Sequence, residues 1–158
     1  MKAPDMPPDV RMDYRSLSDE AFVHAFESCH ITGESFRHAD HVRLAWIYVT
    51  RFGPRMAEER FSEGLRRLAA QLGIPEKFHL TVTLAWLRVV AARVKSDQVQ
   101  SFDDWISIHL ELLDRSFLHN YYSEPCLTSA VARANWVEPD RRPLDETRIA
   151  DADREVAV

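Results

Sequence analysis

The stretch from residue 76 to 94 most constrains the fold, because it is apolar on almost every side of a helix. Its apolar residues are Phe78, Leu80, Val82, Leu84, Ala85, Trp86, Leu87, Val89, Val90 and Ala91. They do not alternate strictly with polar residues, and the stretch is longer than a typical strand, so we predict a helix. A helix that is apolar on most sides must be surrounded by other elements. We therefore predict an all-α, single-domain bundle with this helix at its centre.

Helical periodicity elsewhere predicts the helices that surround the central one, giving a bundle of five to six helices. Ser18 is a good N-cap with acidic residues behind it, and Gly53-Pro54 ends one helix and begins the next. The segments with a helical pattern are 18–32, a second from Ser35 or His38 to 53, 54–72, 102–113 and 116–121, with a further turn or two at 129–136.

The two ends of the chain lack helical periodicity. Residues 1–16 are rich in proline and charge, and we expect a flexible N-terminal arm there. Residues 139–158 are charged and contain few large apolar side chains, so we expect an extended or disordered tail. The helical domain is therefore predicted to span residues 17–138.

Composition and charge exclude several classes of protein. The formal net charge is −5, and the arginines are scattered among acids, which argues against a nucleic-acid partner. The N-terminus lacks the apolar core of a signal peptide, and no apolar run is long enough to cross a membrane. We therefore expect a cytoplasmic protein with no membrane partner, in which Cys29 and Cys126 are reduced. An exposed apolar side on the helix at 105–113 would permit a homodimer.

Three of the seven histidines stand at the starts of two strongly apolar helices. His38 and His41 are three residues apart, so both lie on one helix face and their ring nitrogens can converge on one ion. His79 falls in the first turn of the central helix, where a buried imidazole needs a partner. The positive helix N-termini favour the neutral imidazoles that bind metals. We predict a three-histidine site with an open position for zinc, iron or copper.

The leading hypothesis is a small metal-dependent enzyme that acts on a small molecule, with specialised biosynthesis as one setting. One alternative is a non-catalytic small-molecule-binding or accessory protein, and another is a metal-free acid–base enzyme with His79 as the base. In a purely structural alternative, His38 and His41 flank their helix and His79 satisfies a buried backbone group. The candidates for proton transfer are Glu34 and Tyr122, and those for substrate contact are Trp46, Lys77, Thr83 and Trp86.

Two motifs resemble those of a family of small uncharacterised bacterial helical proteins. They are F-x-H-x-x-H-V-R-L-A-W at residues 36–46 and K-F-H-x-T-x-T at residues 77–83. Residues 121–123 and 139–144 are similar as well, and the resemblance covers roughly residues 20–145. Because this family has no established activity, the resemblance implies only that the two histidine segments form one unit.

Overall fold

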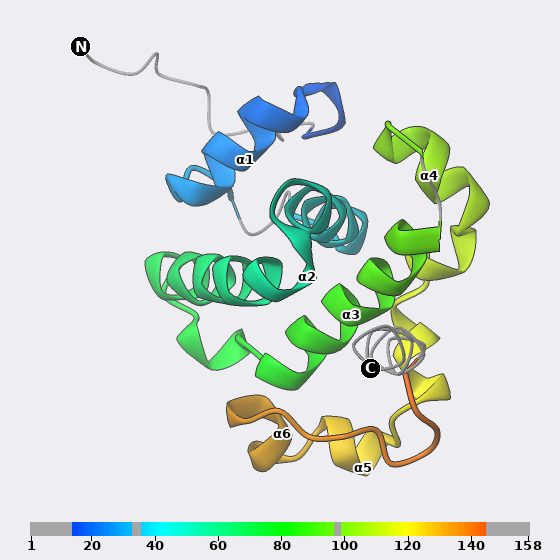
Figure 1. Ribbon diagram of the computed structural model, residues 1–158. Helices are drawn as coiled ribbons and strands as arrows, with labels where there is room; N and C mark the ends of the chain where they lie inside the picture. The colour runs from blue at the N-terminus through cyan, green and yellow to red at the C-terminus, as the bar shows by residue number, and fades with distance from the viewer. Residues whose placement is uncertain (1–13, 33–35, 97–98, 145–158) are drawn as a thin grey trace, which may run out of the picture.

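The computed structural model of the chain describes residues 14–32, 36–96 and 99–144. Within these ranges the chain forms helices and no strand, which confirms the all-α prediction (Figure 1). The α-helices are α1 (Asp19–Glu27), α2 (His38–Gln71), α3 (Leu80–Ser96), α4 (Phe102–Ile108), α5 (Glu124–Leu127) and α6 (Ala130–Ala134). Four short 3₁₀ helices accompany them: η1 (Tyr14–Ser16), η2 (Pro75–Lys77), η3 (Leu110–Leu113) and η4 (Arg115–Asn120).

The long helix α2 consists of two helical halves that meet at Gly53. Gly53 has φ 78° and ψ 164°, a left-handed conformation that side-chain-bearing residues rarely adopt. Pro54 then begins the second half, where its missing N–H leaves no helical hydrogen bond unmade. Figure 1 shows the two halves running in different directions. The helix break predicted from Gly53-Pro54 is therefore confirmed.

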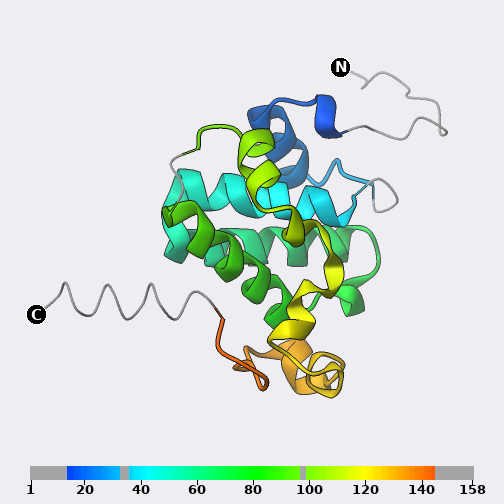
Figure 2. The ribbon, with the colours of Figure 1, turned by 90° about the vertical axis from the view of Figure 1, so that its right-hand side faces the viewer.

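Helix α3 lies in the interior of the bundle, as its apolar sequence predicts. It packs most extensively against α2 and next against α6, while α1 lies on the other side of α2 (Figures 1 and 2). Ala85, Leu87, Val89 and Val90 of α3 are all at most 1% exposed. None of the described helices combines the length and the apolar character needed to cross a bilayer.

The central helix begins at Leu80 rather than near residue 76. The preceding Pro75–Lys77 forms the 3₁₀ turn η2 instead. His79 then caps α3, because its Nδ1 accepts a hydrogen bond of 3.1 Å from the backbone N–H of Val82. His79 thus stands just before the helix and not inside its first turn.

The helix predicted at 102–113 is divided at His109. This residue has φ −123° and ψ 47°, which ends α4, and the chain continues as η3. The imidazole of His109 packs on the buried Trp105, with 5.0 Å between the ring centroids. The turn of η3 buries Leu112 and brings its carbonyl to the imidazole of His38.

The chain after α6 packs against the domain as far as Leu144, which is buried. The N–H of Arg141 donates to the carbonyl of Tyr121 at 2.9 Å, and the N–H of Ser123 donates to Asp140 Oδ1 at 2.7 Å. The domain boundary predicted at residue 138 therefore falls inside a packed segment. At the other end, Tyr14 of the predicted arm is buried. The remainder of the predicted arm and tail, at 1–13 and 145–158, lies outside the described residues.

Candidate functional site

A pocket of about 440 Å³ lies between the two halves of α2 and the start of α3. This volume falls within the range of about 300–1,000 Å³ that is typical of small-molecule sites. The first half of α2 contributes His41, the second half contributes Phe61 and Leu65, and α3 contributes Val82 and Trp86. The polar side chains of the lining are His41, Lys77, His79, Thr83 and Arg115. The kink at Gly53 allows both halves of α2 to line the same hollow.

His41 is the imidazole of the pocket that makes no hydrogen bond to a described residue. Its ring packs against Phe36, with 4.4 Å between the centroids, but no hydrogen bond joins its ring nitrogens to another described residue. Burial, with smaller contributions from the nearby His38 and Arg115, lowers the pKa of His41 to about 4. At neutral pH the ring is therefore uncharged, with one N–H donor and one lone pair available to a ligand.

His79 uses both of its ring nitrogens within the protein. Nε2–H donates to the carbonyl of Leu127 at 2.7 Å, and Nδ1 accepts from the N–H of Val82 at 3.1 Å. Burial lowers the pKa of His79, and the charge of Arg133 acts in the same direction. The ring is therefore neutral, and a metal ion or a substrate proton could reach its lone pair only after the hydrogen bond to Val82 breaks.

His38 is likewise attached to the backbone, through Nε2–H, which donates to the carbonyl of Leu112 at 2.8 Å. Its ring meets the edge of Trp86, with 4.6 Å between the centroids. Burial lowers the pKa of His38, so this imidazole too is biased towards the neutral form. Its Nδ1 makes no hydrogen bond to a described residue. His38 thus contacts Trp86, which lines the pocket, but does not itself line it.

The structure brings two of the three predicted metal ligands, His41 and His79, to one pocket, with His38 beside it. In the part of the chain that the structure describes, no three His, Cys, Asp or Glu side chains are grouped so that they could hold a metal ion. Backbone hydrogen bonds engage one ring nitrogen of His38 and both ring nitrogens of His79. The three-histidine metal site stays a prediction.

Three of the predicted substrate contacts, Lys77, Thr83 and Trp86, do line the pocket. Arg115 lines it as well, although the sequence pattern did not single it out. Arg115 comes from η4 and approaches the start of α2 from a distant part of the sequence, where its charge lowers the pKa values of His38 and His41. The sequence gives no signal for it beyond its charge, because Arg115 falls between the segments with a helical pattern at 102–113 and 116–121.

Two other predicted site residues, Trp46 and Tyr122, lie away from the pocket. Trp46 is 4% exposed and packs against Phe102 and Trp105 on the α4 side of the molecule. Tyr122 is fully buried, and its hydroxyl donates to the carbonyl of Val137 at 2.7 Å. Both side chains therefore belong to the packed core. Glu34 lies outside the described residues.

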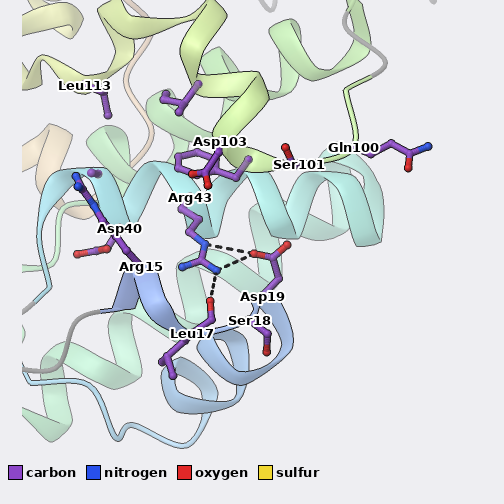
Figure 3. Close-up of a pocket in the computed structure, with 13 residues that line it drawn as sticks. Arg15, Leu17, Ser18, Asp19, Asp40, Arg43, Gln100, Ser101, Asp103 and Leu113 are labelled. Carbon is purple, nitrogen blue, oxygen red and sulfur yellow. Dashed lines mark hydrogen bonds and ion pairs between the residues drawn. The ribbon is translucent and has the colours of Figure 1, made fainter.

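A second hollow, of about 660 Å³, lies between the starts of α1, α2 and α4 (Figure 3). Its central cation is Arg43, which pairs with Asp19 at 2.9 Å and donates to the carbonyls of Tyr14 at 2.6 Å and Leu17 at 2.8 Å. Figure 3 shows the guanidinium held between Asp19 and Leu17. Arg43 thus fastens α1 to α2, and its donors are engaged within the protein. The pocket of His41 differs in that a half-buried imidazole in its wall makes no hydrogen bond to a described residue.

Comparison with models of protein families, with curated proteins and with solved structures finds no match to this chain. The resemblance of the two histidine motifs to a bacterial family therefore stays a prediction. A function for the chain has to be argued from the geometry of the pocket itself.

Proposed function

We propose that the chain binds a small molecule in the pocket between α2 and α3, and that His41 is its polar contact. One observation carries the proposal: a half-buried, neutral imidazole stands in an apolar wall and makes no hydrogen bond to a described residue. Its neighbours His38 and His79, in contrast, bond to backbone carbonyls. A net contribution of about 0.5–1.5 kcal/mol is typical of a hydrogen bond. A ligand that hydrogen-bonds to His41 would gain such a contact.

The rest of the wall supports the same proposal. Phe78, Val82 and Trp86 are only partly buried where they border the pocket, so a ligand there would remove apolar surface from water. Each Å² of apolar surface so removed stabilises the complex by about 25 cal/mol. An apolar hollow with a few polar groups is also the usual form of a small-molecule site.

Fluorescence titration with N-phenyl-1-naphthylamine, a neutral apolar probe, tests the proposal. We expect the probe to bind the wild-type protein saturably and one-to-one. It should bind at least tenfold more weakly to Val82→Trp, in which the larger side chain fills the pocket. The matched control Val131→Trp should bind the probe as the wild-type protein does. Val131 is 62% exposed on α6, outside the pocket. If Val82→Trp does not fold, Leu72→Trp replaces it, because Leu72 lines the pocket and is 36% exposed. Absence of saturable binding, or equal affinity in filling and control variants, overturns the proposal.

A metal-dependent enzyme is the second candidate, and the neutral pair His38 and His41 favours it. His38 Nδ1 and both nitrogens of His41 are free of hydrogen bonds to described residues, and neutral imidazole is the form that binds zinc, iron or copper. Calorimetric titration with each metal, under reducing conditions for ferrous and cuprous ions, tests it. One-to-one binding should be lost in His41→Ala and kept in His24→Ala, an exposed control. No stoichiometric binding of any of these ions rules this candidate out.

A further inference from the structure

The charged side chains that line the pocket are all positive. Lys77 and Arg115 are its charged residues, and no described Asp or Glu lines it. Two more arginines stand behind the wall: Arg66 lies 4.9 Å above the ring of Phe78, and Arg133 Nη1 donates to the carbonyl of Glu76 at 2.8 Å. An apolar hollow with cations at its rim raises the local concentration of anions.

Arg115 is the cation best placed to meet a ligand. No hydrogen bond or ion pair joins its guanidinium to a described residue. The neighbouring Asp114 makes no ion pair with it; the Asp114 carboxylate instead accepts hydrogen bonds from the N–H and the hydroxyl of Ser116 at 2.9 and 2.7 Å. Among the described residues, nothing engages the donors of Arg115, which a ligand in the pocket could use. His41 is near enough to feel this charge and lines the same pocket.

We infer that the ligand of this pocket is an apolar carboxylate, with Arg115 as the partner of the carboxylate and His41 as an additional hydrogen-bond contact. This inference rests on the proposed function. A guanidinium offers two parallel N–H groups that match the two oxygens of a carboxylate. The neutral imidazole of His41 supplies an N–H to the same group without a second charge. The aromatic and aliphatic wall formed by Phe78, Val82 and Trp86 takes the apolar body.

Displacement of bound N-phenyl-1-naphthylamine by octanoate and by 1-octanol tests the inference, because the two competitors share a chain and differ in charge. We expect octanoate to displace the probe from wild-type protein at a concentration at least tenfold lower than octanol. Arg115→Gln should abolish this preference and leave the octanol curve unchanged. Arg55→Gln, on the exposed surface of α2 outside the pocket, is the matched control and should keep the preference.

The outcomes separate the inference from the proposed function. If the probe binds but octanol competes as well as octanoate, or if Arg115→Gln keeps the preference, the carboxylate inference is wrong and the small-molecule site stands. If the probe does not bind to the wild-type protein at all, the proposed function itself fails. Circular dichroism of each variant identifies any that has lost its fold. If Arg115→Gln does not fold, Arg115→Lys replaces it, because lysine keeps the charge but lacks the two parallel N–H groups. We then expect the preference for octanoate over octanol to fall at least threefold.

Discussion

Thr81 joins the first turn of α3 to the segment that follows α6. Its side chain is fully buried, and its hydroxyl donates to the carbonyl of Asn135 at 2.6 Å and accepts from the N–H of Val137 at 3.1 Å. The substitution Thr81→Val keeps the shape of the side chain and removes both hydrogen bonds. Each backbone group left buried without a partner costs about 1–3 kcal/mol. We therefore expect Thr81→Val to lower the free energy of unfolding by about 2–6 kcal/mol in total.

Thr83 provides a matched control on the same helix, because it is 8% exposed and also donates its hydroxyl within the protein. Its acceptor, the carbonyl of His79, also accepts from the N–H of Thr83 at 3.0 Å and so stays satisfied in Thr83→Val. This variant should lose less than about 1 kcal/mol. Urea unfolding followed by circular dichroism measures both, with an unchanged m-value expected. Similar losses in the two variants would refute the reasoning.

Two further predictions concern packing and pH. Gly64→Ala should lower the free energy of unfolding by about 1–2 kcal/mol, because the added alanine Cβ would lie 2.6 Å from the fully buried ring of Phe26. An unchanged urea midpoint would contradict this prediction. The pKa of His41 falls from 6.5 to about 4 on folding, so between these pH values the unfolded state binds a proton that the folded state does not. The free energy of unfolding of the wild-type protein should therefore fall as the pH drops from 7 to 4, and His41→Gln should make that fall smaller by about 2–3 kcal/mol. Parallel pH profiles of the two proteins in urea unfolding would contradict this prediction.

The helical fold could be predicted because its signals are local. The apolar run of α3 and the Gly53-Pro54 break can be recognised from neighbouring residues alone, and both predictions are confirmed. The start of α3 could not be predicted, because the imidazole of His79 is fixed by the carbonyl of Leu127, far away in the sequence. Helix α5 has four residues, too few to show a period.

The candidate site could be predicted in part for the same reason. His41, His79 and Trp86 belong to helix starts and apolar faces that the sequence reveals, and all three line the pocket. Arg115 reaches it from the first residue of a 3₁₀ helix, just before the predicted segment 116–121, so the helical pattern does not indicate where its side chain lies. Trp46 lies on a helix that is apolar on several sides, so the sequence pattern does not indicate which element its side chain contacts. In the structure the ring of Trp46 packs against Trp105 of α4.

The central claim is that a small molecule binds in this pocket against His41. Long-range ¹H–¹⁵N correlation spectra of protein labelled in its histidine rings test this most directly during a titration with octanoate. We expect the ring nitrogens of His41 to shift with saturation, while His79 keeps the proton on Nε2 and the exposed His24 stays unchanged. Saturable displacement of N-phenyl-1-naphthylamine by octanoate with no change in the His41 signals would contradict the account.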